Sequence, residues 1–309
     1  MDKIYVAGHN GMVGSAIVRV LRQNGYTNLL LRSSAELDLR DQRSTTDFFA
    51  SEKPDYVFMA AAKVGGILAN KERQAEFFYD NMAIELNTIQ TAHLSGVKKF
   101  CFLGSSCIYP KLAPQPIKED YLMTGPLEET NFGYASAKIA GVKMCEAYHD
   151  QYCFNYVALM PCNLYGPGDN FDPLSSHVLP ALLRKVIEAE EKNEDTLVMW
   201  GTGTPKREFL YVDDVASACV FLMKHEHATG LFNVGMGEDI SIKNLLQKIC
   251  QIVGYQGTIV PDPSKPDGMP RKLLNISKLK TLGWQPTTNL DEGIKRLHAW
   301  FLKHRHEFT

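Results

Sequence analysis

Near its start the chain combines a short apolar run with three regularly spaced glycines. Residues 3–8 read Lys-Ile-Tyr-Val-Ala-Gly, and Gly8, Gly11 and Gly14 lead into a helical pattern of apolar residues. A second strand is predicted at 28–32, so strand, turn, helix and strand form a βαβ unit of about 30 residues. In such a unit the glycines allow a tight turn and close approach of the backbone to a pyrophosphate. The triplet alone could also be a plain turn.

Strands and helices continue to alternate through the first half of the sequence. Strand-like runs at 55–62 and 98–110 flank a helical stretch at 75–95. This alternation favours an α/β fold with a doubly wound parallel sheet of the Rossmann type. After residue 164 the composition shifts to glycine- and proline-rich loops. Further on, we expect a helix that Asp213 caps and another helix that starts at a Ser241 cap and stops at Gly254. We therefore expect a dinucleotide-binding domain and a smaller C-terminal substrate domain, made of residues 1–164 plus 209–235 and of residues 165–208 plus 236–309 respectively.

Composition argues against several classes of function. The 309 residues carry a formal net charge of −2, so the sequence gives no electrostatic sign of binding to nucleic acid or a membrane surface. The N-terminus shows no secretory leader, and no apolar stretch approaches the roughly 20 residues of a membrane span, so we expect a cytoplasmic protein. Seven cysteines without a Cys-x-x-Cys pair indicate reduced thiols, and we expect no metal site.

Four side chains with useful chemistry occur at the end of the 98–110 strand and soon after it. Tyr134 and Lys138 are four residues apart, so on a helix they share one face, where the cation would lower the pKa of the phenol. Ser105 and Cys107 end the strand, at the edge where open parallel sheets bind ligands. If the chain stays extended there, both side chains point into the same crevice. The set predicts a proton-donating site, although a lone Tyr-x-x-x-Lys is weak evidence.

The end of the second strand bears on the choice of dinucleotide. A carboxylate at this place binds the adenosine ribose of NAD, whereas an arginine accommodates the 2′-phosphate of NADP. Arg32 stands here and is followed by Ser33 and Ser34. The sequence therefore favours NADP, although Arg32 could also be a solvated strand end.

These motifs and others resemble the extended short-chain dehydrogenase/reductase family, and within it the enzymes that epimerise and reduce GDP-4-keto-6-deoxy-D-mannose. The glycines follow the Gly-x-x-Gly-x-x-Gly form of that family rather than Gly-x-Gly-x-x-Gly. The resemblance spans nearly the whole chain. It rests on residues 8–16, 61–66, 104–110 (Gly-Ser-Ser-Cys-Ile-Tyr-Pro), 131–138, 163–171, 176–182 (Ser-His-Val-Leu-Pro-Ala-Leu), 200–209 and 266–272.

The resemblance implies a role for each matching residue. Tyr134, helped by Lys138 and Ser105, would protonate the sugar C4 oxygen as NADPH delivers hydride to C4. Cys107 and His177 would remove and return protons at C3 and C5. The substrate would contact Asn163, and its GDP part would contact Lys185, Trp200, Arg207 and Asp267. The cofactor would contact Gly8, Asn10, Gly11, Met12, Val13, Gly14, Arg32, Ser34, Leu39, Ala61, Leu103, Ser105, Tyr134, Lys138, Pro161, Asn163, Leu164 and His177. A homodimer through the helices near 75–95 and 134–150 is also implied.

Several alternatives remain open from sequence. The chain could be another nucleotide-sugar enzyme of this fold, although a 4-epimerase needs neither Cys107 nor His177, and a 4,6-dehydratase typically has an acidic pair after the strand-end serine. It could also be a non-catalytic dinucleotide sensor, although such proteins can lose the Tyr/Lys pair. Some family members have arginine where this chain has Asn10 and Ser34, so NADH use deserves a test. Taken singly, His177 could be structural and Cys107 a core thiol.

Overall fold

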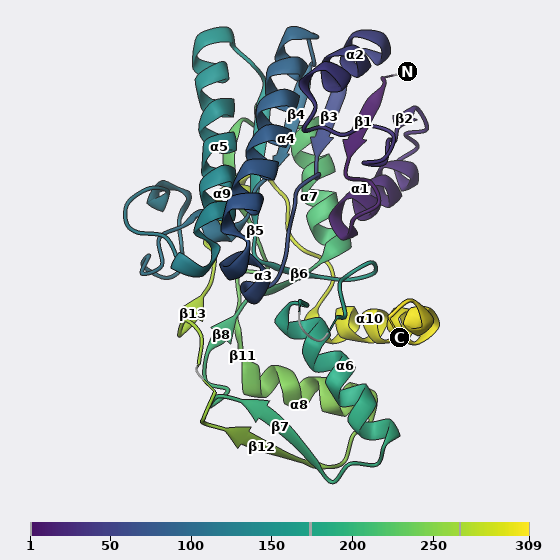
Figure 1. Ribbon diagram of the computed structural model, residues 1–309, viewed down its shortest axis with the longest axis vertical. Coiled ribbons are helices and arrows are strands. Elements are labelled where there is room, and N and C mark those ends of the chain that lie inside the picture. The colour runs from purple at the N-terminus through teal and green to yellow at the C-terminus, as the bar shows by residue number, and fades with distance from the viewer. Residues whose placement is uncertain (1, 173–174, 266, 309) are drawn as a thin grey trace.

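A computed structural model describes residues 2–172, 175–265 and 267–308 (Figure 1). Its main sheet contains six parallel strands in the order β10-β5-β4-β3-β1-β2. These strands are β1 (Ile4–Ala7), β2 (Leu29–Leu30), β3 (Tyr56–Met59), β4 (Lys99–Leu103), β5 (Tyr156–Pro161) and β10 (Gly230–Val234). The predicted doubly wound parallel sheet is confirmed, including the return of residues 230–234 to it.

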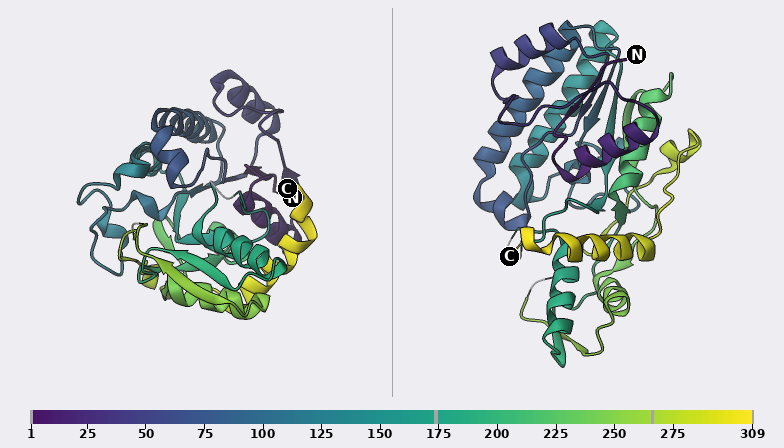
Figure 2. Two further views of the ribbon diagram at one scale, coloured as in Figure 1. Left: turned by 60° about the horizontal axis from the view of Figure 1, so that its bottom comes forward. Right: turned by 90° about the vertical axis from the view of Figure 1, so that its right-hand side faces the viewer.

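Helices cover both faces of this sheet, as the right-hand view of Figure 2 shows. On one side α2, α4 and α5 pack side by side, and on the other side α1 packs against α7. The bounds are α1 (Met12–Gln23), α2 (Gln42–Glu52), α4 (Gln74–Leu94), α5 (Phe132–Tyr152) and α7 (Val212–Lys224), with the short α3 (Ile67–Glu72) before α4. Within the described residues, no helix is both long and apolar enough to cross a membrane.

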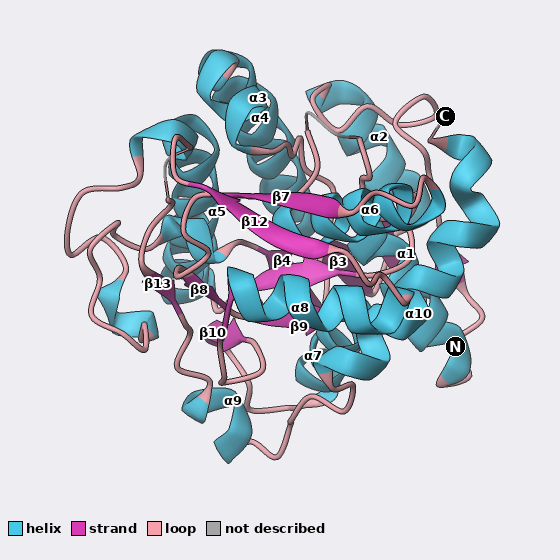
Figure 3. Cartoon of the chain, turned by 90° about the horizontal axis from the view of Figure 1, so that it is seen from below, coloured by secondary structure: helices cyan, strands magenta, loops and turns pink. Residues whose placement is uncertain are grey.

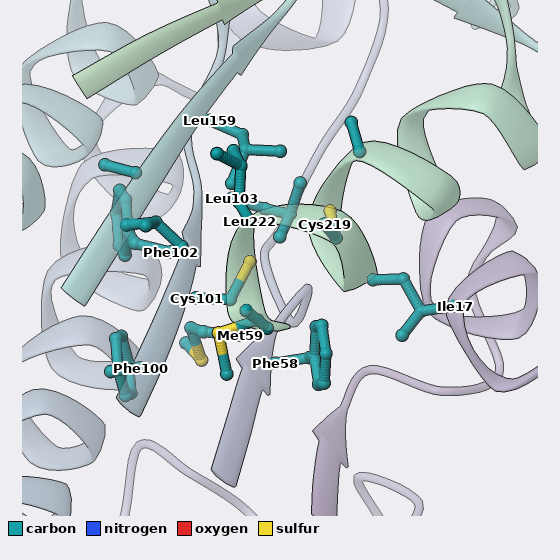
Figure 4. Packing of buried hydrophobic residues seen from close by; sticks show 14 of the residues in the cluster. Ile17, Phe58, Met59, Phe100, Cys101, Phe102, Leu103, Leu159, Cys219 and Leu222 are labelled. Carbon is teal, nitrogen blue, oxygen red and sulfur yellow. The ribbon is translucent and has the colours of Figure 1, made fainter. Parts of the chain in front are cut away.

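The core between sheet and helices explains why the strands read as apolar runs. When helices cover both faces of a sheet, the side chains on both faces are buried, so every position along a strand favours an apolar residue. All five residues of β4 are buried, and the Cys101 side chain on this strand lies in the same cluster as Cys219 of α7 and Met59 of β3 (Figure 4). These thiols are therefore packing groups of the main core.

A second apolar cluster lies below the main sheet. The cluster is made by α6 (Val178–Glu191), α8 (Ile242–Val253), α10 (Leu290–His304) and the parallel pair β7 (Thr196–Trp200) and β12 (Thr258–Asp262), with α10 packed against α8, as seen from below in Figure 3. The remaining elements are β6 (Asn163–Tyr165) with β9 (Phe209–Tyr211), the sheet β11 (Ile240–Ser241), β8 (Lys206–Arg207) and β13 (Arg271–Lys272), α9 (Ser277–Thr281), and 3₁₀ turns η1 (Ser106–Ile108), η2 (Glu119–Tyr121), η3 (Glu129–Asn131) and η4 (Arg305–Glu307).

The predicted division into two domains stays a prediction, but it can be compared with the two apolar clusters. Tyr165, Leu183 and Leu246 belong to the second cluster, on the side the division assigns to the substrate domain. Leu274 and Trp284, assigned to that same domain, instead pack in the cluster of the main sheet. The end of the chain thus contacts both clusters.

The ends of two helices show where neighbouring residues are enough to predict a helix boundary and where they are not. The helix predicted after Ser241 is α8, whose first turn donates from Asn244 N to Ser241 Oγ at 3.2 Å and which ends at Gly254 with φ of +94°. The prediction that Asp213 caps the next helix upstream is wrong. Helix α7 already begins at Val212, and the Asp213 carboxylate instead forms an ion pair with Arg19, 2.6 Å away.

Candidate active site

The glycine-rich turn lies where the order of the strands in the sheet reverses. Strand β1 stands between β2 and β3, so the strands that follow β1 and β3 lie on opposite sides of this point. Open parallel sheets bind ligands at such a point, beyond the carboxyl ends of the two strands. Gly8 follows β1 with φ of +79°, and a Cβ on it would lie 2.7 Å from Ala61 N, just beyond β3. A Cβ on Gly14 would lie 2.0 Å from Gly8 O. Larger residues would therefore break this close packing.

This turn fits the pyrophosphate of a dinucleotide. The N-cap of α1 is Gly11, so no side chain caps the first backbone N–H groups of the helix, which can then bind an anion. Gly168, in the loop after β6, encloses the helix start, because a Cβ on it would lie 3.6 Å from Met12 Cα. Of the further predicted cofactor residues, Ala61, Leu103 and Pro161 stand at or just after the ends of β3, β4 and β5, and Asn163 and Leu164 lie in β6, directly after β5.

Arg32, the predicted 2′-phosphate ligand, already has a partner. Its guanidinium donates to the Glu52 carboxylate at 2.9 Å and lies 5.8 Å from the centre of the Phe48 ring. Asn10 follows β1 and Ser34 follows β2. The carbonyl of the buried Leu39 accepts from Asn87 Nδ2 at 2.9 Å. The ion pair holds the arginine at the end of the second strand.

Ser105 and Cys107 are neighbours, but not in the expected way. Strand β4 ends at Leu103, and residues 106–108 form a 3₁₀ turn instead of continuing extended. Gly104 packs against Met160 at this point, with only 2.2 Å from its would-be Cβ to the methionine methyl group. The Cys107 backbone N–H then donates to Ser105 Oγ at 3.3 Å. The two side chains are brought together by this turn, so the prediction of an extended exit is wrong.

Tyr134 and Lys138 both lie in the first turns of α5, as predicted. The Lys138 Nζ is 5.9 Å from the centre of the Tyr134 ring and 4.9 Å from that of Phe102. It also lies 3.0 Å from a carboxylate oxygen of Glu85 on α4, in an ion pair whose side chains are 1% and 2% exposed. Burial raises the pKa of the Tyr134 phenol well above its ordinary value, and Cys107 and Glu85 add to this. The predicted lowering of the phenol pKa by Lys138 is therefore wrong for the ligand-free protein, because burial dominates and keeps Tyr134 a neutral phenol.

Charged groups from distant segments act on the Cys107 thiol, which lies in the 3₁₀ turn after β4. Burial raises the pKa of its thiol, while Lys272, the Ser105 hydroxyl and Lys138 act in the opposite direction. Lys272 belongs to β13, where it pairs in register with Arg207 of β8. Burial lowers the pKa of the Lys272 ammonium, and Cys107 partly offsets this. The thiol thus has a cationic neighbour from the far part of the chain.

His177 enters from a different element. It is the N-cap residue of α6 and is exposed, yet enough protein surrounds its ring for burial to lower the pKa of the imidazole. The preceding loop lies against the exit of β3, because a Cβ on Gly66 would be 2.7 Å from Ser175 O. Within the described residues, no hydrogen bond or ion pair joins His177 to the other predicted catalytic groups.

The predicted nucleotide residues gather around β7 and β8. Lys185 Nζ donates to the carbonyl of Val198 on β7, the strand that ends with Trp200, which is 68% exposed. The Asp267 carboxylate accepts from Thr202, just after that strand, at 2.9 Å and 2.7 Å. Arg207 Nη1 donates to Met269 O at 2.6 Å. Asn163 of β6 donates to Glu208 O at 2.9 Å, so it contacts the residue that follows Arg207.

Sequence reasoning did not find two charged residues of the cluster, Glu85 and Lys272. Lys272 ends the matching stretch 266–272, so the resemblance carried a signal for it. Glu85 lies on a helix that reads as apolar packing, 53 positions before its partner Lys138 (138 − 85). The sequence could have indicated Glu85 only by placing a carboxylate on the buried face of a helix, because such a group needs a charged partner.

Together, this fold and site define a dinucleotide-dependent α/β enzyme, and the comparisons agree. Residues 4–235 match the model of the NAD dependent epimerase/dehydratase family, to which the chain belongs. It is 52% identical over 316 residues to the GDP-L-fucose synthase of Escherichia coli (strain K12), covering 99% of this chain and 98% of that protein. It is 52% identical over 301 residues to GDP-L-fucose synthase 1 of Arabidopsis thaliana, covering 97% and 93%. A solved GDP-L-fucose synthetase from Naegleria fowleri bound to NADP matches with a TM-score of 0.90 at 28% identity, covering 99% and 95%.

Asp169, beside the glycine-rich turn, should make stability depend on pH. It is 5% exposed, its Oδ2 has no hydrogen-bond partner among the described residues, and burial raises the pKa of its carboxyl to about 7. Because the folded-state pKa is the higher one, stability is lost as pH rises from about 4 to 7, by up to about 4 kcal/mol. We expect Asp169→Asn to flatten this part of the melting-temperature profile of the ligand-free protein. An equally steep profile in the variant would contradict this.

Proposed function

We propose that this chain is a bifunctional 3,5-epimerase and NADPH-dependent 4-reductase that converts GDP-4-dehydro-6-deoxy-D-mannose to GDP-L-fucose. The observation that carries the proposal is the cluster of Ser105, Cys107, Tyr134 and Lys138 at the carboxyl edge of the sheet. A 4-reductase alone has no use for the thiol, whereas an epimerase needs such a group. Two relatives more than 50% identical over nearly the full chain carry the name GDP-L-fucose synthase.

One pocket can serve both reactions because the same oxygen carries the charge. A proton next to a ketone is removable when negative charge can move onto the C4 oxygen, and hydrogen-bond donors at that oxygen stabilise the resulting enolate. Tyr134 and Ser105 would supply these donors. A bound NADPH would supply hydride to C4, and the neutral Tyr134 phenol would give its proton to the C4 oxygen.

Inversion at C3 and C5 needs two further groups. A proton must leave one face of the sugar and another must arrive on the opposite face, so one residue cannot do both. Cys107 and His177 would form this pair. They come from different elements, the turn after β4 and the start of α6, which suits an approach from two sides. The lowered pKa of the His177 imidazole leaves it neutral near neutral pH.

The nucleotide would lie over β7 and β8. Arg207 and Lys185 suit a pyrophosphate, since arginine offers a bidentate fork and lysine a point charge. Burial lowers the pKa of both groups, and a nearby anion would offset this cost of burying their charges. The exposed Trp200 ring has Lys265 Nζ 5.5 Å from its centre and an open face for the guanine base. Asp267 would contact the same end of the substrate.

The proposal is tested by following NADPH oxidation with GDP-4-keto-6-deoxy-D-mannose as substrate. We expect turnover with this compound and none with GDP-mannose, which lacks the C4 ketone. Reduction without any change at C3 and C5 would indicate a plain 4-reductase and overturn the bifunctional assignment. No turnover at all would favour a dinucleotide-binding protein without this activity. All seven cysteines are free thiols, which fits the proposed location in the reducing cytoplasm.

NADPH binding should depend on Arg32. Charge-assisted hydrogen bonds contribute about 1.5–3 kcal/mol each, so Arg32→Ala should raise the KM for NADPH about tenfold to a hundredfold. The KM for NADH, which lacks the 2′-phosphate, should change little. The matched control is Arg43→Ala on α2, an exposed arginine whose 3.9 Å ion pair with Asp47 lies on its own helix. An equal effect of Arg32→Ala on both cofactors would show that Arg32 does not select NADPH.

A homodimer would cover an apolar stripe on α4. Tyr79, Leu86 and Leu94 are 71%, 46% and 69% exposed and follow each other at helical spacing. A second copy of the same stripe could cover it by two-fold symmetry. We expect sedimentation to give twice the chain mass, and Tyr79→Glu to give the monomer. Leu112→Glu, at an isolated residue that is 85% exposed, should leave the dimer intact. A monomeric parent protein would end this proposal.

A further inference from the structure

Glu85 and Lys138 form a buried ion pair between two helices behind the candidate active site. The Lys138 Nζ lies 3.0 Å from a Glu85 carboxylate oxygen, and neither side chain is more than 2% exposed. Neither group has a well-aligned hydrogen bond to another partner among the described residues. Each charge therefore depends on the other for compensation, because an unpaired ion is costly in the interior.

Helix α5 is shaped to admit this carboxylate. A Cβ on Gly141 would lie 2.6 Å from Glu85 Oε2 and 2.5 Å from the ring of Phe102. Glycine is unfavourable inside a helix, so a glycine at this point indicates that the space is needed. The ammonium, held at this depth, reaches 5.9 Å from the Tyr134 ring centre. The pair is thus built next to the phenol rather than at a remote contact of α4 with α5.

We propose that Glu85 is a positioning residue for the reductase step: its carboxylate anchors the Lys138 ammonium and keeps Tyr134 a neutral phenol with a proton to give. The inference rests on the proposed function. An ammonium without a counter-charge would favour the phenolate, which cannot donate. A reductase needs the donor form, so a carboxylate that offsets the lysine favours reduction.

The charged groups around the ion pair are those that can change the pKa of the Tyr134 phenol. The titratable or charged groups near the pair are Tyr134 on α5, Cys107 on the turn after β4, Cys145 further along α5 and, through Cys107, Lys272 of β13. Glu85 acts to raise the pKa of both Tyr134 and Cys145, and burial raises the pKa of Glu85 itself against the effect of Lys138. Burial, Cys107 and Glu85 thus all favour the neutral phenol, and Glu85 is the carboxylate among these groups.

The test compares the pH dependence of kcat/KM for reduction in the parent protein, Glu85→Gln and Glu85→Asp. Without the negative charge the phenol ionises sooner, so the alkaline limb of Glu85→Gln should move to lower pH by about one unit or more. Glu85→Asp keeps the charge and should restore most of the parent profile. An alkaline limb of Glu85→Gln at the parent pH would overturn the proposal, however much stability is lost.

The control variant separates this effect from simple destabilisation. Asp214→Asn removes another buried carboxylate, which accepts from Thr287 N at 3.1 Å and Thr288 N at 3.0 Å away from the site. It should lower the melting temperature without moving the alkaline limb, and a moved limb would overturn the electrostatic interpretation. If Glu85→Gln does not fold, Glu85→Met, which also removes the charge, takes its place, and an alkaline limb at the parent pH again overturns the proposal.

A second readout does not depend on the reaction. Ultraviolet titration of the phenolate, with the Tyr134→Phe protein subtracted, reports ionisation of Tyr134 itself. The phenolate should form at lower pH in Glu85→Gln than in the parent protein, and identical titrations would overturn the proposal. If the parent protein does not turn over the keto sugar, the proposed function fails while this titration still tests Glu85.

Discussion

Tyr134→Phe is expected to lower kcat for NADPH oxidation at least a hundredfold with the GDP-linked keto sugar. General acid catalysis contributes about 10²–10⁴-fold to rates, and in this protein the neutral phenol beside Lys138 would be the acid. The substitution removes one hydroxyl and keeps the ring that packs near the ammonium. The KM for NADPH should therefore change much less than kcat, which steady-state kinetics can distinguish.

The matched control is Tyr156→Phe. This tyrosine is also buried, but it begins β5 and so lies at the opposite edge of the sheet from the glycine-rich turn. Its loss should leave kcat unchanged. Full turnover by Tyr134→Phe would refute the role given to the phenol.

Cys107→Ser is expected to stop exchange of the C3 and C5 protons with solvent, by at least about a hundredfold. A hydroxyl is a far weaker acid than a thiol, so serine can neither lose nor return the proton at working pH. Burial raises the pKa of the Cys107 thiol, and Lys272, Ser105 and Lys138 partly offset this, an effect that a serine hydroxyl cannot use. Deuterium uptake from heavy water, followed by nuclear magnetic resonance, measures the loss.

Two comparisons make this result specific. Cys153→Ser changes an exposed thiol at the end of α5 and should leave exchange at the parent rate. Tyr134→Phe should still exchange measurably, because it loses a donor to the C4 oxygen rather than a group that moves the carbon-bound protons. A Cys107→Ser protein that exchanges normally would show that the acid/base assignment is wrong.

Local signals account for the parts of the fold that the sequence predicted. The apolar strand before Gly8, the cap at Ser241 and the stop at Gly254 are set by residues within one or two turns of each other. The alternation of such units is enough to specify a parallel sheet, because parallel strands need a helical crossover. The edge that holds the site follows from this, whereas the order of the strands is seen only in the structure.

Contacts between distant segments explain the errors and omissions. Packing of Gly104 on Met160 turns the chain after β4, and Arg19 binds Asp213 from 194 positions away, so neither could be read from neighbouring residues. The Glu85–Lys138 pair likewise joins two helices. The resemblance supplied residues of the candidate site that spacing alone could not connect, above all His177.

The central claim is that one pocket both inverts C3 and C5 and reduces C4. Its most direct measurement is a single incubation of GDP-4-keto-6-deoxy-D-mannose with NADPH in heavy water, with the product analysed by nuclear magnetic resonance. We predict GDP-L-fucose that carries solvent deuterium at C3 and C5 and cofactor-derived hydrogen at C4. A reduced product with protium and unchanged configuration at C3 and C5 would contradict the account.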